Sequence, residues 1–373
     1  MRSKYYILLF ILSFLIVACN KDNSTDPTDV LAEKIEVVIN DIPFQTEKYL
    51  RIPYTLKLWE YEKEGLKLEK IQVFDAITNL ELLKLENEGI PYIYKGPLPA
   101  NNYYIPDAIT SYYLSIQLPI PLGSPKPTKV FHKFTLRDTI NNTVKSYEGG
   151  IFSPRLSETP IIIASPVKGN NWIFINQSTN AYHFYVNFFK DGKIYNGERF
   201  AFDNLQFNEA LTNYFDGDPK ANTSYHNYGD TLFAVANGKV ISIKDGRLEN
   251  NGDACDVVIN NTDELGGNYL VLQMDNGYYA FYAHCKPNSF FVNIGENVKE
   301  GDPLALLGNS GNSTAPHLHF EITNSSDILF SNGLPFVLKK YTKIAEMDTV
   351  AVPVTPTDIY NSMMEELSII NFQ

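Results

Sequence analysis

The chain has 373 residues, a length that fits two domains better than one small domain. Its residues are 44% hydrophobic and 20% charged, so it can build packed cores and is not wholly disordered. The 43 Asp and Glu outnumber the 31 Lys and Arg, and the net charge of −12 would repel phosphate backbones, which excludes nucleic acid as a partner. The 24 Tyr and 23 Phe favour strands over helices, and three cysteines are too few for a disulfide scaffold.

The N-terminal residues are typical of an export signal. Arg2 and Lys4 precede an apolar run from Tyr6 to Val17, and the run leads to Ala18 and Cys19. Such a run has the length of a secretory signal and is short for a membrane span. An ordinary signal peptide and an anchor helix are the two simplest interpretations of this pattern.

Residues 16–19 (IVAC) also resemble the bacterial lipobox, in which the signal is cleaved before the cysteine and the thiol is lipidated. We therefore predict a lipoprotein signal peptide at 1–18, a lipidated Cys19 and a polar, flexible tether at 19–30. We therefore expect the protein in the cell envelope, lipid-anchored in the outer membrane of a Gram-negative bacterium.

Residues 31–165 alternate between apolar and polar side chains in short runs, as in Tyr54–Trp59 and Leu114–Leu118. Period-two patterning with turn-rich gaps predicts an antiparallel, immunoglobulin-like β-sandwich. His132 lies on one of these alternating runs, without a Cys, His or acidic cluster nearby, and is interpreted as structural rather than as a ligand.

A second all-β domain is predicted at 172–345, followed by a C-terminal extension at 346–373. Residues 268–274 and 278–284 form a hairpin pattern closed at Asn276-Gly277. The only helical signal there is a short helix at 357–367.

Five of the six histidines follow residue 180. His317 and His319 lie two apart on a predicted strand and therefore share one face, after a loop of small residues. His284 ends the preceding aromatic strand, and Asp203 lies in an apolar stretch where a carboxylate needs a partner or a metal. Imidazole and carboxylate groups suit a catalytic zinc ion with three protein ligands.

Residues 172–341 resemble the lysostaphin-type zinc endopeptidases, which cleave peptide crossbridges of bacterial cell walls. The matching motifs stand in the family's order: YGDTLFAVANGKV (228–240), GGNY (266–269), FYAH (281–284), VKEGDPLALLGNSG (298–311) and HLHF (317–320). The resemblance implies an antiparallel β-sheet peptidase domain. Residues 50–165 also resemble the sandwich that precedes the peptidase in one subgroup.

Carried over residue by residue, the resemblance implies that Asp203 and His319 bind one zinc ion, while His284 and His317 assist catalysis. The family's first motif is H-x-x-x-D, but Arg199 stands four residues before Asp203. His183 occupies the place from which one subgroup draws its histidine, and it is the predicted third ligand. The implied reaction is hydrolysis of peptidoglycan crossbridge peptides by zinc-activated water, with a histidine as general base.

His226 and Asp230 also fit H-x-x-x-D, but Asp230 lies in the turn before a strand motif, so neither is expected to bind metal. Three functional hypotheses remain open: an active enzyme, an inactive family member that binds the wall or activates a hydrolase, and a lipoprotein that binds partners through its sandwich. A Cys255–Cys285 disulfide and two separate thiols are both compatible with the sequence. No sequence feature indicates an oligomeric state.

Overall fold

The computed structural model describes residues 34–91, 93–94, 111–176 and 182–373. The predicted signal peptide, Cys19 and the whole of the predicted tether lie outside these residues. Within the described part of the chain, no helix is long and apolar enough to cross a membrane.

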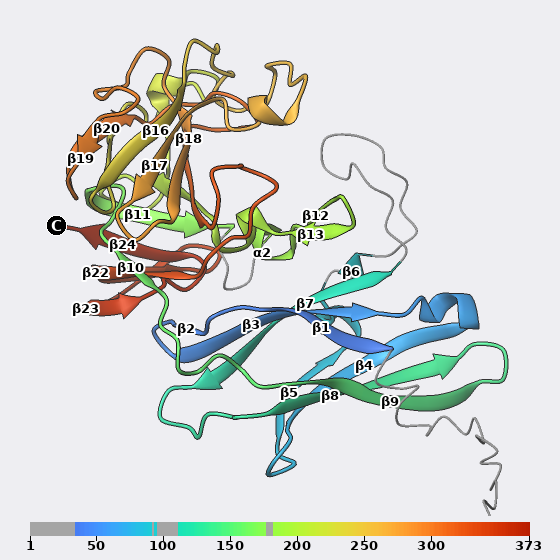
Figure 1. Cartoon of the computed structure of the whole chain (residues 1–373). Helices are drawn as coiled ribbons and strands as arrows, with labels where there is room; N and C mark the ends of the chain where they lie inside the picture. Colours follow the sequence, from blue (N-terminus) through green and yellow to red (C-terminus); the bar gives the residue numbers. More distant parts are fainter. Residues whose placement is uncertain (1–33, 92, 95–110, 177–181) are drawn as a thin grey trace, which may run out of the picture.

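The N-terminal region is a sandwich of two antiparallel sheets (Figure 1). The first sheet has the order β1-β3-β7-β6, with β2 paired to β3: β1 Ile35–Asn40, β2 Phe44–Gln45, β3 Tyr49–Leu58, β6 Ile93–Tyr94 and β7 Tyr112–Pro121. The second has the order β5-β4-β8-β9: β4 Leu66–Asp75, β5 Glu81–Glu86, β8 Val130–Asp138 and β9 Thr143–Phe152. In β8 every second residue is buried, which shows the period-two pattern directly.

The C-terminal region is built on one 11-stranded sheet. Its order is β10-β22-β24-β11-β14-β21-β18-β17-β16-β19, with β23 paired to β22. The bounds are β10 Ile161–Ile163, β11 Gly169–Ile175, β14 Phe202–Gln206, β16 Gly238–Lys244, β17 Asn268–Met274, β18 Tyr279–Cys285, β19 Asn297–Val298, β21 Leu318–Thr323, β22 Phe336–Met347, β23 Ala351–Ser362 and β24 Ser368–Phe372. The predicted all-β fold is therefore confirmed, and so is the 268–284 hairpin, formed by β17 and β18.

Short elements complete this region. Two small antiparallel pairs are the hairpin of β12 Phe188–Lys190 with β13 Lys193–Tyr195, and the long-range pair of β15 Thr231–Phe233 with β20 Pro303–Leu306. The described helices are single turns: α2 Tyr182–Tyr185 and the 3₁₀ turns η1 Tyr61–Glu64, η2 Asn87–Gly89, η3 Gly197–Phe200, η4 Asn222–Ser224 and η5 Thr262–Glu264.

The C-terminal segment differs from its sequence-based prediction. The helix predicted at 357–367 is wrong, because these residues belong mostly to β23, and β24 follows immediately. Strand β24 lies between β22 and β11 in the main sheet, so residues 346–373 form part of the sheet that carries the site. Pairing along the whole length of β22 outweighs the weak helical pattern.

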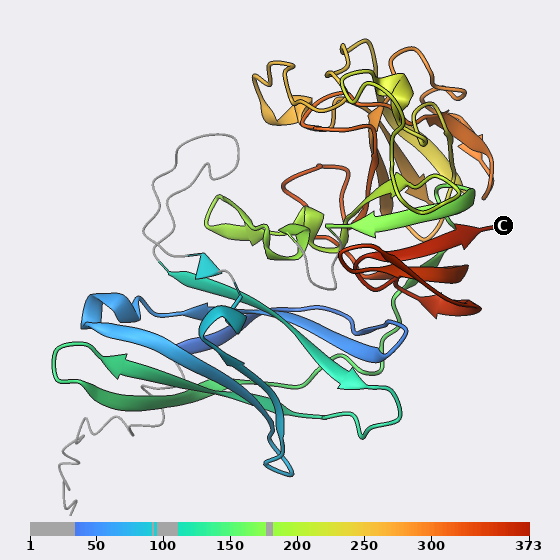
Figure 2. The same ribbon diagram turned by 180° about the vertical axis from the view of Figure 1, so that it is seen from behind.

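The two regions pack against each other along β2, β3 and β7 of the sandwich (Figures 1 and 2). Phe44 of β2 is fully buried in the core of the C-terminal region, with its ring centroid 5.8 Å from that of Phe200. Ion pairs also cross this boundary, among them Arg51 with Glu365 at 2.8 Å and Lys343 with Glu47 at 2.5 Å.

Candidate metal centre

The centre begins with a pair of neighbouring strands. Asp203 of β14 lies directly opposite His319 of β21, which brings the Asp203 Oδ1 atom to 3.0 Å from His319 Nδ1. Because β21 also pairs with β18, Ala283 lies opposite His319 on the other side, and His284 follows at the end of β18. The sheet register therefore fixes where all three functional side chains start.

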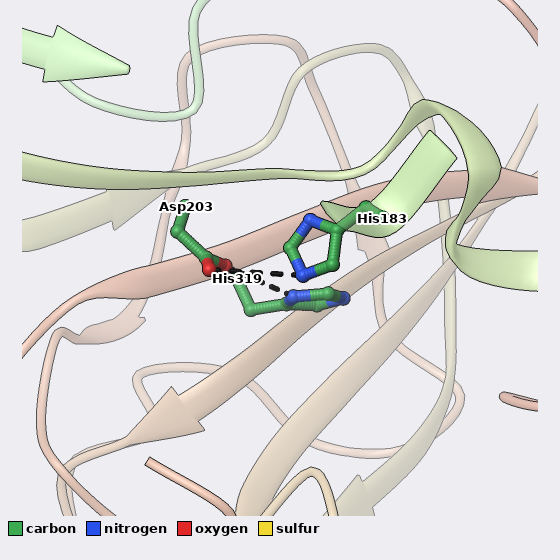
Figure 3. Close-up of side chains that lie close together, drawn as sticks. All are labelled: His183, Asp203 and His319. Atoms are coloured by element: carbon green, nitrogen blue, oxygen red, sulfur yellow. Dashed lines mark hydrogen bonds and ion pairs between the residues drawn. The ribbon is translucent and has the colours of Figure 1, made fainter. Parts of the chain in front are cut away.

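His183 reaches the same point from a different element. It lies on the single turn α2, and its Nε2 atom is 3.7 Å from Asp203 Oδ2. Its ring is nearly perpendicular to that of His319, with 4.8 Å between the centroids (Figure 3). One ligand atom each from His183, Asp203 and His319 lies within 4.8 Å of the other two, so the structure brings together the three residues predicted as ligands.

The local charges favour a cation in this group. Burial raises the pKa of Asp203, but the charges and hydrogen bonds of His183, His317 and His319 outweigh it, and the net pKa lies well below its usual range. Burial lowers the pKa of His319, yet its contacts with Asp203 and Glu321 raise the net pKa well above normal. A buried, ionised carboxylate stabilises nearby positive charge. That charge is either the proton of a protonated imidazole or a metal ion that replaces this proton.

The other two histidines lie beside this group. Their ring centroids are 4.6 Å apart, and His317 Nε2 is 3.5 Å from Asp203 Oδ1. His317 Nδ1 donates to the Ala315 carbonyl at 2.8 Å, and His284 Nδ1 donates to the Ser310 carbonyl at 2.7 Å. A carbonyl can only accept, so both imidazoles keep Nε2 as the nitrogen with a free lone pair when neutral.

His284 is held in an uncommon backbone conformation, with a φ of 62°. Its backbone N–H donates to Gly266 O at 2.9 Å, and burial followed by the charges of His317 and His319 lowers its side-chain pKa well below normal. Gly267, with a φ of +64°, allows the loop carrying Ser310 to approach, because a Cβ atom there would lie 2.4 Å from the Ser310 backbone. This close backbone contact presents the Ser310 carbonyl to His284.

All five predicted residues line one cavity of about 260 Å³. The two imidazoles and one carboxylate of the ligand group fit zinc, which takes three N or O protein ligands in catalytic sites and leaves a position open. The cavity provides room beside the group for a water molecule and part of a substrate. The donor chemistry therefore fits the predicted metal.

The residues of the second H-x-x-x-D pattern lie elsewhere. His226 is partly exposed, with Nε2 3.5 Å from Asp216 Oδ2, and it is not in the ligand group. Asp230 lies in the turn before β15, where burial raises its pKa to about 6. The structure thus keeps both residues away from the three clustered ligands.

Three polar residues near the centre were missed by the sequence analysis. Asn176 donates from Nδ2 to Asp203 Oδ2 at 2.9 Å, Glu198 lines the cavity, and Glu321 Oε2 lies 3.6 Å from His319 Nε2. A signal for Glu321 was available, because it stands two residues after His319 on a strand and must share its face. The sequence holds no comparable signal for Asn176 or Glu198.

The cysteines are separate thiols. Cys255 is exposed and Cys285 is buried, and no disulfide joins them in the described structure. Burial raises the pKa of Cys285 strongly, so this thiol stays protonated beside the centre.

Comparison with known proteins agrees with this geometry. Residues 224–329 match the model of peptidase family M23. The suspected lysostaphin-type family is thereby confirmed. The M23 segment includes His284, His317 and His319, while His183 and Asp203 precede it.

Individual relatives match over short stretches. The peptidoglycan DD-endopeptidase ShyA of Vibrio cholerae is 38% identical over 66 residues, which are 18% of this chain and 15% of that protein. The glycyl-glycine endopeptidase ALE-1 of Staphylococcus capitis is 33% identical over 115 residues, which are 30% of this chain and 29% of that protein. The chain thus spans less than a third of the length of these relatives. Among solved structures, the catalytic domain of lysostaphin from Staphylococcus simulans matches with a TM-score of 0.22 and 24% identity, covering 32% of this chain and 84% of that one.

Proposed function

We propose that this protein is a zinc metalloendopeptidase of the bacterial cell envelope that hydrolyses peptide bonds in peptidoglycan crossbridges. One observation carries the proposal: the His183, Asp203 and His319 ligand atoms lie within 4.8 Å of one another in a cavity that also holds His284 and His317. The sequences similar to this chain include peptidases named for peptidoglycan or glycyl-glycine bonds, which supports the proposed substrate.

His183, Asp203 and His319 would hold one zinc ion. When bound, zinc supplies a Lewis acid that lowers the pKa of water and polarises a carbonyl group. The chain's own contribution is proton transfer and orientation. His284 and His317 each fix Nδ1–H on a backbone carbonyl, so each has Nε2 available to accept a proton or to donate one to developing negative charge.

The location is proposed from the sequence. With Cys19 lipidated as predicted, acyl chains would anchor the protein in the outer membrane and the polar tether would hold the domains away from its surface. The peptidoglycan layer would then be within reach of the site.

Two measurements on the purified full-length protein test the proposal. We expect one zinc ion per chain and turnover of crosslinked muropeptides that a chelator abolishes and zinc restores. Zinc binding without turnover of any muropeptide would favour the inactive, wall-binding alternative. A chain that takes up no zinc would contradict the proposal as a whole.

A further inference from the structure

Arg199 is the charged residue most deeply buried between the two regions of the molecule. It stands four residues before Asp203, on η3, and its side chain is 0% exposed. A buried guanidinium requires ionic and hydrogen-bonding partners, since desolvating a charge is costly. The partners of Arg199 therefore show which parts of the molecule its side chain connects.

The partners of the guanidinium come from the sandwich. Arg199 Nε lies 2.7 Å from Asp41 Oδ2, and Nη1 donates to Thr55 Oγ1 at 2.9 Å and to Ser115 Oγ at 3.0 Å. Thr55 and Ser115 are cross-strand partners on β3 and β7, and their hydroxyl groups lie 3.0 Å apart. The sandwich therefore presents a paired hydroxyl site and a carboxylate to one arginine.

The other side of the same guanidinium faces α2. Its Cζ atom lies 4.3 Å from the ring centroid of Phe184, the residue after His183. Phe184 is 1% exposed and also contacts Phe200, which in turn packs on Phe44 of the sandwich. With only one helical turn, α2 has too few internal hydrogen bonds to fix His183 alone, so its position depends on these contacts.

We propose that the sandwich is a structural part of the metal centre and that Arg199 is the positioning residue through which it acts. Asp41, Thr55 and Ser115 hold the guanidinium, the guanidinium holds Phe184, and Phe184 fixes the single turn that carries His183. This inference rests on the proposed function, because it assumes that His183 binds the metal. It also explains why an arginine stands four residues before Asp203, where the H-x-x-x-D motif has its histidine. The Arg199 side chain binds the sandwich, and the histidine ligand, His183, is supplied by α2 instead.

The test compares two conservative cation exchanges at the same boundary. Arg199→Lys keeps the positive charge but loses the planar fork that contacts Asp41, both hydroxyls and Phe184 together. Lys343→Arg is the matched control, because Lys343 is also buried and pairs with Glu47 of the sandwich but contacts neither α2 nor a ligand residue. Both full-length variants are titrated with Zn²⁺ against a chelator and with Co²⁺, whose visible absorption reports the number and type of ligands.

We expect Arg199→Lys to lower zinc affinity about 10- to 100-fold, the effect typical of residues that orient a metal ligand. Its Co²⁺ spectrum should change as His183 is lost from the ligand set, whereas Lys343→Arg should keep the wild-type affinity and spectrum. A merely structural role for Arg199 would lower the unfolding temperature and leave the spectrum of the folded fraction unchanged. A folded Arg199→Lys protein with wild-type affinity and spectrum would therefore overturn the inference.

A second variant covers the case in which Arg199→Lys does not fold. Thr55→Val removes one acceptor of the guanidinium from within the sandwich at nearly constant volume and leaves the ion pair intact. We expect weaker zinc binding and an altered Co²⁺ spectrum here too, and unchanged values would contradict the inference. Failure of the proposed function is distinguishable, since in that case the wild-type chain itself binds no zinc.

Discussion

Each of the two regions buries histidine, but in opposite electrostatic surroundings. In the sandwich, His132 is fully buried between the Gly150 carbonyl at 3.0 Å and the Tyr54 hydroxyl at 2.8 Å. In the C-terminal region, His319 is buried between Asp203 at 3.0 Å and Glu321 at 3.6 Å. Burial lowers the pKa of His132 to about 4, whereas the two carboxylates raise that of His319 well above normal.

This difference shows what makes a buried histidine a candidate ligand. A neutral imidazole with neutral hydrogen-bonding partners is satisfied and contributes to packing, as His132 does beside the rings of Tyr54 and Phe152. An imidazole beside buried carboxyl groups, at least one of which is held ionised as Asp203 is, marks a point where positive charge is stabilised. Burial alone therefore does not separate the two kinds of histidine, but their acidic neighbours do.

The largest expected effect is loss of the metal itself. Asp203→Ala and His183→Ala should each abolish stoichiometric zinc binding and activity, because two remaining ligands are too few to hold the ion. Metal content after gel filtration measures this. The controls are His226→Ala and Asp230→Ala, which lie outside the ligand group and should keep zinc and most activity. A metal-free His226→Ala protein beside a zinc-loaded His183→Ala protein would show that the first ligand is misassigned.

The next effect separates catalysis from binding within the same cluster. His284→Ala and His317→Ala should each lower kcat by about 10²–10⁴-fold, the usual cost of losing a proton-transfer group, with zinc retained. Turnover of crosslinked muropeptides and metal content are measured on the same preparations. Stoichiometric zinc loss in His317→Ala would mean that the roles of His317 and His319 are exchanged.

Much of this arrangement could be predicted from the sequence, because it depends on local rules. The period-two pattern predicted the sandwich strands and the β17–β18 hairpin, and the same rule placed His317 and His319 on one face. The resemblance supplied His183, because no local pattern links it to Asp203 across the 19 intervening positions and a change of element.

The features that the sequence did not predict also have physical explanations. The strand order that inserts β24 between β22 and β11 depends on pairing between residues far apart in the chain, which periodicity does not encode. The helix prediction at 357–367 is wrong because it gave too little weight to the strand preference of Thr357, Ile359 and Tyr360. These three residues pair with β22. The role of Arg199 could not be predicted either, because its partners Asp41, Thr55 and Ser115 lie in the other region.

The depressed pKa of His132 predicts that the stability of the sandwich depends on pH. His132 titrates near 4 when folded and near 6.5 when unfolded, so the unfolded state binds more protons between these values. The free energy of unfolding should therefore decrease by up to roughly 3 kcal/mol as the pH falls from about 6.5 to 4.

Trp59 packs in the sandwich beside Tyr61 and Tyr147, so its fluorescence in a Trp172→Phe background reports urea unfolding of this region. His132→Phe should flatten the pH dependence between pH 7 and 4 compared with the same background. An equal slope in both proteins would show that other groups dominate the acid sensitivity of the sandwich.

The smallest effect concerns the second carboxylate beside His319. Glu321 is 1% exposed, and its Oε2 atom faces His319 Nε2, while Nδ1 of the same ring faces Asp203. A carboxylate in this position favours the proton on Nε2 and so leaves Nδ1 free to bind metal. Burial raises the pKa of Glu321 and its contact with His319 opposes that rise. Glu321→Gln keeps the shape and one acceptor oxygen but cannot carry a negative charge, so zinc affinity measured by chelator competition should fall by about tenfold.

Glu264→Gln is the matched control for this last prediction, because Glu264 is a half-buried carboxylate that pairs with Arg247 at 3.0 Å and contacts no ligand. Its zinc affinity should equal that of the wild type. If Glu321→Gln also binds zinc as the wild type does, then Asp203 alone sets the protonation state of His319. The contrast between the two buried histidines would in that case depend on one carboxylate rather than two.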